Sequence, residues 1–172
     1  MKIRSFIMVL AITCIASLNA FSQISEDCVS LNPNNVKVSG SGSLWKVVDG
    51  SHSAFAAPTK AEAEQIVAVI KKYKINKSCF VGRPDPSFTY LLKDSAAPSG
   101  AMAGEDCLNF NPANLSVQPA GSGFRIQDGS HLMFSFPNIL EAASALYIMG
   151  KYGFTQSCFV GRPNASLAYL RK

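Results

Sequence analysis

Two short β-rich runs separated by a turn occur in each half of the chain and predict a β-hairpin there. In the first half, residues 44–48 and 51–55 flank Asp49-Gly50, and in the second half residues 124–127 and 130–136 flank a matching Asp-Gly pair. This pattern is a strong hairpin signal, because the favoured two-residue turn needs positive φ at both central positions. Apolar and polar residues alternate within 124–127, so we expect one covered face and one solvated face.

The apolar pattern changes to a helical period directly after each hairpin. Thr59 and Glu62 form a capping box, and Asn138 and Glu141 occupy the same positions in the second half. The residues expected to cover a sheet from each helix recur at helical spacing: Ala63, Ile66, Val67, Ile70 and Tyr73 in the first, and Ala142, Leu146, Met149 and Tyr152 in the second.

Short apolar runs on either side of these elements complete the unit. Residues 35–38 form a strand candidate before the hairpin, and residues 79–81 and 88–91 form two more after the helix. The loop between the last two contains Gly82 and two prolines and reads as a stiff turn. We therefore predict an α+β fold in which each half has the order β-β-β-α-β-β, a small antiparallel sheet with one helix packed on it.

The two halves are copies of one unit. Residues 26–93 and 105–172 align without a gap, and about 30 of the 68 pairs are identical, which indicates a duplicated domain. The longest identical run is Ser-Cys-Phe-Val-Gly-Arg-Pro, which begins at Ser78 and again at Ser157. Residues 94–104, rich in Ala, Ser, Gly and Pro, are expected to form a flexible linker between repeat 1 (26–93) and repeat 2 (105–172).

The N-terminus predicts export. Lys2 and Arg4 precede a mostly apolar run at 6–18, and small residues follow where a signal peptidase would cut, so residues 1–22 read as a signal peptide. The run is shorter than the roughly twenty residues that span a bilayer, and we expect no integral membrane segment. Secretion or a periplasmic location follows, with Cys14 removed alongside the signal.

Four cysteines remain in the mature chain, one early and one late in each repeat. If each repeat is stapled within itself, Cys28 pairs with Cys79 and Cys107 with Cys158; exchange between repeats is the alternative. An oxidising compartment permits such bonds. Each would close a loop of about 52 residues and contribute on the order of 4 kcal/mol in the chain-entropy estimate, a large share for so small a unit.

Charge and motif content exclude several function classes. The net charge of +5 includes Lys2 and Arg4, and the remaining charge of about +3 is too small and scattered to indicate nucleic-acid binding. One histidine per repeat is too few for a zinc site, and no other metal or cofactor is expected. A nucleophilic triad is not expected either, since the cysteines are assigned to disulfides and no serine stands in a nucleophile elbow. We therefore expect no enzyme.

Polar residues shared by both repeats are the ligand-binding candidates. In an ideal hairpin His52 would face Val47, and a partly buried histidine bonded to backbone is the simpler explanation for it. For Arg83, an ion pair with Glu26 or Asp27 is as good an explanation as a functional role. The candidates are Arg83, Arg162, His52, His131, Asn32, Asn111, Asn35, Asn114, Tyr90 and Tyr169.

Three functions from different classes fit this pattern. The leading one is a secreted, non-catalytic binding protein whose two modules act bivalently on a glycan, a surface or another protein, gaining avidity through the duplication. The alternative is a two-headed proteinase inhibitor that presents Arg83 and Arg162, each followed by proline, on braced loops. A small enzyme is disfavoured, because the expected catalytic groups are missing.

Overall fold

The computed structural model describes residues 26–172, so the predicted signal peptide and Cys14 lie outside the described part of the chain. Repeat 1 contains β1 (Asp27–Ser30), β2 (Val36–Ser41), β3 (Leu44–Asp49), β4 (His52–Ala57), α1 (Lys60–Tyr73), β5 (Lys77–Val81) and β6 (Phe88–Leu92). Repeat 2 contains β7 (Asp106–Asn109), a 3-10 turn (Pro112–Asn114), β8 (Leu115–Ala120), β9 (Gly123–Asp128), β10 (His131–Phe136), α2 (Ile139–Tyr152), β11 (Gln156–Val160) and β12 (Leu167–Arg171).

The predicted α+β fold and its β-β-β-α-β-β order are confirmed in both repeats, with one addition. A short strand around the first cysteine, β1 or β7, precedes the predicted elements and pairs with the strand of the second cysteine. Each repeat therefore forms two three-stranded antiparallel sheets, ordered β2-β3-β4 and β1-β5-β6 in repeat 1 and β8-β9-β10 and β7-β11-β12 in repeat 2. The predicted cysteine pairing within repeats is also confirmed, because Cys28 binds Cys79 and Cys107 binds Cys158 across these extra strand pairs.

The hairpin turn lies one residue later than predicted. It is Gly50-Ser51, so His52 faces Asp49 and not Val47. A bulge between the Val47 and Val48 pairs leaves Ala54 without a partner on β3. Repeat 2 has the same register, in which His131 faces Asp128, not Ile126, and the bulge residue is Met133. The Asp-Gly signal located the turn, but the bulge that shifts the turn by one residue has no marker in the residue pattern.

Both helix starts follow the prediction, while each buried face is rotated slightly around its helix axis. The Thr59 hydroxyl and the Asn138 side chain each accept the N3 backbone N–H, as a capping box requires. The buried residues are Ala63, Ile66, Val69, Ile70 and Tyr73 in α1, and Ala142, Ala145, Ile148, Met149 and Tyr152 in α2. Val67 and Leu146, predicted to be in the core, are only partly buried.

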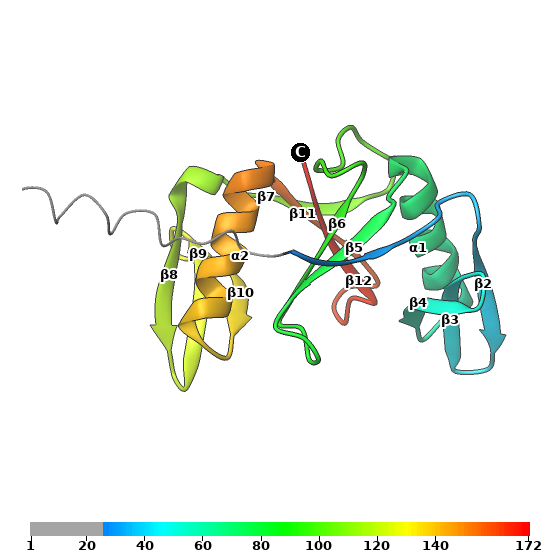
Figure 1. Ribbon diagram of the computed structural model, residues 1–172, viewed down its shortest axis with the longest axis horizontal. Helices are drawn as coiled ribbons and strands as arrows, with labels where there is room; N and C mark the ends of the chain where they lie inside the picture. Colours follow the sequence, from blue (N-terminus) through cyan, green and yellow to red (C-terminus); the bar gives the residue numbers. More distant parts are fainter. Residues whose placement is uncertain (1–25) are drawn as a thin grey trace, which may run out of the picture.

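The cores that cover the two helices are shared between the repeats. One hydrophobic core joins α1 and the β2-β3-β4 sheet of repeat 1 to Cys158, Val160, Leu167 and Tyr169 of repeat 2. The second core joins α2 and the β8-β9-β10 sheet of repeat 2 to Cys79, Phe88, Tyr90 and Leu92 of repeat 1. Figure 1 shows the two hairpin-and-helix units at opposite ends, with β5, β6, β11 and β12 crossing between them. The repeats therefore interleave, and each completes the core of the other.

The shared heptapeptide lies at this contact between repeats. A Cβ placed on Gly82 would come within 2.5 Å of Glu141 Oε2, at the start of α2. Glu141 also accepts a hydrogen bond of 2.5 Å from the Ser87 hydroxyl. Repeat 2 reproduces the arrangement, with Gly161 against Glu62 and Ser166 donating to the same carboxylate. Each capping glutamate thus binds its own helix start and also the last hairpin of the other repeat.

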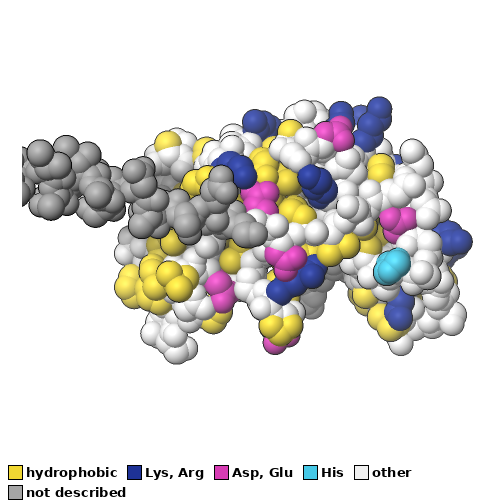
Figure 2. All heavy atoms as spheres, in the orientation of Figure 1, with side chains coloured by type: hydrophobic (Ala, Val, Ile, Leu, Met, Phe, Trp, Pro, Cys, Tyr) yellow, Lys and Arg dark blue, Asp and Glu magenta, His cyan; other side chains and the backbone are white. Residues whose placement is uncertain are grey.

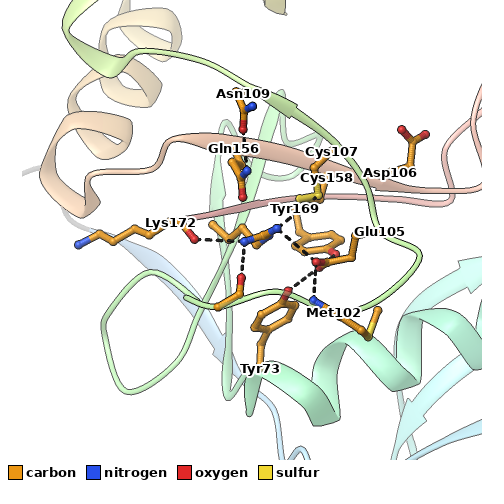
Figure 3. Close-up of a disulfide and its surroundings, with 12 residues drawn as sticks. Tyr73, Met102, Glu105, Asp106, Cys107, Asn109, Gln156, Cys158, Tyr169 and Lys172 are labelled. Atoms are coloured by element: carbon orange, nitrogen blue, oxygen red, sulfur yellow. Dashed lines mark hydrogen bonds and ion pairs between the residues drawn. A yellow bond between two sulfur atoms is a disulfide. The ribbon is translucent and has the colours of Figure 1, made fainter.

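Two further carboxylates tie the repeats together at the opposite helix ends. Glu105 accepts hydrogen bonds from Tyr73 of α1 (2.6 Å) and from Tyr169 (2.5 Å), and it forms an ion pair of 3.3 Å with Arg171 (Figure 3). Its counterpart Glu26 accepts from Tyr152 of α2 at 2.7 Å, and Lys151 donates to it at 2.7 Å. Only 4% of the Glu105 side chain is exposed, so this charge is held almost entirely by protein groups.

The predicted linker at 94–104 makes several contacts with the folded repeats. Lys93 and Ala96 form an isolated bridge, and Ala97 is buried in the α2 core. The Lys172 backbone N–H donates to the carbonyl of Pro98 at 2.8 Å, and the Arg171 guanidinium donates to that of Gly100. The connection therefore lies along the body of the protein and crosses from one repeat to the other beside the C-terminal strand.

We expect Gly161→Ala to destabilise the protein by about 1–3 kcal/mol, because Gly161 has a φ of 81° and a Cβ there would press on Glu62. Gly150→Ala is the matched control. Gly150 lies in α2 with open space around it, so the same change should stabilise the protein by about 0.5–1 kcal/mol. Chemical denaturation of both variants measures the difference; equal stability of the two variants would contradict the contact.

Stability should also fall in acid. Burial alone would raise the pKa of Glu105, but hydrogen bonds from Tyr169, Tyr73 and the Met102 N–H, with the charge of Arg171, hold that pKa below its usual value. A lowered folded-state pKa gives stability that is complete above the unfolded pKa of about 4.3 and is lost as the pH falls through the folded one.

Glu105→Gln should therefore flatten the acid limb of the stability curve and cost about 2 kcal/mol or more at neutral pH. Glu64→Gln, which removes an exposed pair with Lys60, should change stability by no more than about 0.5 kcal/mol. Urea unfolding between acidic and neutral pH measures both effects. An unchanged acid limb in the Glu105 variant would show that this carboxylate does not link the repeats.

Candidate functional site

A pocket in repeat 1 brings together two of the predicted ligand-binding residues, His52 and Arg83. It has a volume of about 370 Å³ and lies between the β1-β5 strands and the tip of the β3-β4 hairpin. Its lining is Val29, Ser30, Leu31, Asp49, His52, Ser53, Ala54, Ser78, Phe80 and Arg83. We call it the repeat 1 pocket. Figure 2 shows histidine, acidic and basic side chains among apolar ones on the visible face of the molecule.

Asp49 is fixed on one wall of the repeat 1 pocket by two predicted candidates. The backbone N–H of Asn32 donates to Asp49 Oδ2 at 2.7 Å, and the Asn35 side chain donates to Oδ1 at 2.8 Å. Asn32 and Asn35 therefore do not line the pocket themselves but orient a residue that does. From the sequence, Asp49 was explained by the turn alone. In the structure Asp49 pairs with His52 at the base of the turn, and this pairing places Asp49 at the site.

Arg83 forms the opposite wall, where its own repeat holds it in place. Its Nε lies 3.2 Å from Asp27 Oδ2, and its guanidinium lies over the Phe80 ring at 4.2 Å from the centroid. The hypothesis of an ion pair with Asp27 is thus confirmed, whereas Glu26 binds Lys151 and Tyr152. The Arg83 side chain is 41% exposed, and within residues 26–172 its Nη atoms donate no hydrogen bond to protein.

Repeat 2 reproduces this polar arrangement. Arg162 pairs with Asp106 through Nε and Nη2 and lies 4.7 Å above the Phe159 ring. The hydrogen bonds from Arg162 hold the pKa of Asp106 below its usual value. The Asn111 N–H donates to Asp128 Oδ2 at 3.0 Å, and His131 faces that aspartate as His52 faces Asp49. Asn114 ends the 3-10 turn, and its backbone N–H bonds the Asn111 carbonyl.

Tyr90 and Tyr169 do not lie at the pocket. Both are buried, in the α2 core and the α1 core respectively, so each packs against the other repeat. Burial, followed by the nearby Glu26 charge, raises the pKa of Tyr90, and burial with the hydrogen bond to Glu105 raises that of Tyr169. Their presence in both repeats is explained by the contact between repeats.

A second hollow, lined by residues of both repeats, lies between them. It has a volume of about 410 Å³, and we call it the central groove. Its lining is Ala54, Phe55, Phe80, Ser87, Phe88, Thr89, Phe134, Ser166, Leu167 and Ala168. The residue pattern gives no signal for this feature, because it depends on how the two repeats meet. Ala54 and Phe80 line both the central groove and the repeat 1 pocket, so the two spaces are neighbours.

Within residues 26–172, the group of side chains that best matches a metal-binding cluster is Glu105, Cys107 and Cys158. The two sulfurs are joined in a disulfide and Glu105 is bonded to tyrosine and arginine, so this group offers no thiolate to a metal. Among the described helices, none is both long and apolar enough to cross a membrane. Comparison of the chain with protein-family models, curated proteins and solved structures finds no match.

Proposed function

We propose that this is a secreted, non-catalytic binding protein that recognises a hydroxylated ligand, a glycan, at the repeat 1 pocket and at the related site of repeat 2. The observation that carries the proposal is the convergence of Asp49, His52 and Arg83 on one pocket with an apolar side. These residues lie apart in the sequence and are repeated at equivalent positions in repeat 2.

The chemistry of the lining fits sugar hydroxyls. A hydroxyl both donates and accepts hydrogen bonds, so its site needs both kinds of partner. Arg83 offers only donors, Asp49 only acceptors, and His52 and the serines offer both. Phe80 and Leu31 supply apolar surface for the C–H face of a sugar ring. Opposite charges stand side by side, which favours a neutral polar ligand over a strongly charged one.

Pre-organisation supports binding as the role of these groups. Asn32 and Asn35 hold Asp49, and Asp27 and Phe80 hold Arg83, so the polar groups are oriented before a ligand arrives. Orientation fixed in advance lowers the cost of binding. The inhibitor hypothesis receives no such support. An inhibitory arginine has to extend into the specificity pocket of the proteinase, whereas Arg83 is paired with Asp27 of its own repeat.

The interleaved repeats add a geometric consequence to bivalent binding. Since each repeat completes the core of the other, the two sites keep a constant separation and orientation. A rigid pair of sites favours a target that repeats at a matching spacing, such as a polysaccharide or a glycan-covered surface, and avidity then depends on that spacing. The predicted signal peptide and the disulfides are consistent with such a role outside the cytoplasm.

Removing either polar side chain should weaken binding without unfolding the protein. We expect Arg83→Ala and His52→Ala each to lower the affinity for the preferred methyl glycoside by about tenfold, as loss of one or two polar contacts would. The measurement is an NMR titration of labelled mature protein with methyl glycosides of glucose, galactose, mannose and N-acetylglucosamine.

Lys37→Ala serves as the control, since Lys37 is an exposed cation on β2 outside the pocket lining. It should leave the affinity unchanged. Absence of any shift at residues of either site, with all four glycosides at millimolar concentration, would overturn the proposal.

A further inference from the structure

We infer that the ligand is a glycoside with an apolar aglycone, and that the aglycone lies in the central groove while the sugar lies in the repeat 1 pocket. This inference rests on the proposed function and adds the chemistry of the second half of the ligand. The shared lining residues, Ala54 and Phe80, place the groove directly beside the pocket.

The lining of the central groove differs in kind from that of the pocket. The groove residues include no charged side chain, and its largest members are Phe55, Phe80, Phe88, Phe134 and Leu167. Phe88 and Phe134 come from different repeats and meet edge to face, with ring centroids 5.2 Å apart. Such a surface favours an aromatic or alkyl group and offers little to further sugar hydroxyls, apart from three hydroxyl side chains.

Ala54 occupies the boundary between the two spaces because of the bulge in β4. As the unpaired residue of the bulge, it is turned out of the regular alternation that the rest of the strand follows. Its methyl side chain is small and leaves space between the two hollows. A ligand can therefore extend from the pocket that holds the charged side chains across Ala54 into the uncharged groove.

In repeat 2 a larger side chain stands at this boundary, so the two repeats differ there. Met133 stands at the position of Ala54, and Leu132 at that of Ser53. All five lining positions that differ between the repeats carry the larger side chain in repeat 2: Leu108 for Val29, Asn109 for Ser30, Phe110 for Leu31, Leu132 for Ser53 and Met133 for Ala54. The other five lining residues, Asp49, His52, Ser78, Phe80 and Arg83, have identical counterparts in repeat 2, while the residues around them are larger there. Only the repeat 1 site then accepts the aglycone.

The test compares phenyl and methyl glycosides of the same four sugars on the full mature protein. The phenyl form should bind about tenfold tighter or more, because its ring is buried in the groove. In Ala168→Met, which places a larger side chain in the groove at a residue outside the pocket lining, this advantage should disappear, while the methyl glycoside keeps its affinity. Ala56→Met is the matched control, because Ala56 is also an exposed strand alanine and lines neither space.

A direct contact measurement makes the result independent of the variants. Intermolecular nuclear Overhauser effects between the phenyl protons and the rings of Phe88 and Phe134 are expected in the unmodified protein. If methyl glycosides bind but the phenyl forms bind no tighter and show no such contacts, the inference is wrong and the proposed function stands. If neither form binds, the proposed function fails, and this inference fails with it.

Discussion

The structure depends on the covering of each helix by both repeats. The five buried residues of α1 and the five of α2 lie in cores to which both repeats contribute. The hairpin sheet of the same repeat covers one side, and the disulfide-linked sheet of the other repeat covers the second. A unit of this size has a marginal core by itself. Because both repeats contribute to each core, both cores are larger than one repeat could form. Each repeat therefore depends on the other for its folded structure.

This arrangement separates the roles of the residues that both repeats share. Gly82 and Ser87 meet the capping Glu141 of the other repeat, and Tyr90 enters the other repeat's core, so these are structural. Three residues of the heptapeptide, Ser78, Phe80 and Arg83, line the pocket, and Arg83 is the charged one among them. Identity between repeats therefore marks two different things: the contact that holds the pair together and the polar groups of a binding site.

Much of the local structure was predictable from the sequence, and the long-range arrangement was not. Local signals predicted several features. The Asp-Gly pairs located the hairpins, the capping boxes located the helix starts, and the cysteine positions indicated the disulfide pairing. The sharing of cores could not be predicted from the helices. Val69 and Ile148 are buried apolar residues next to the predicted buried face, and nothing in their type shows which repeat covers them. For the site, His52 and Arg83 were identified as repeated polar residues, but Asp49 and the central groove depend on the register and on the second repeat.

The interleaving can be tested on the intact protein by cutting the connection between the repeats. A proteinase recognition sequence inserted between Ala103 and Gly104 allows specific cleavage, and both disulfides lie within a repeat, so the two fragments then share no covalent bond. The shared cores predict that the cleaved protein migrates in size-exclusion chromatography with light scattering as one particle of unchanged mass that contains both fragments. Separation into two folded species of half the mass would contradict the account.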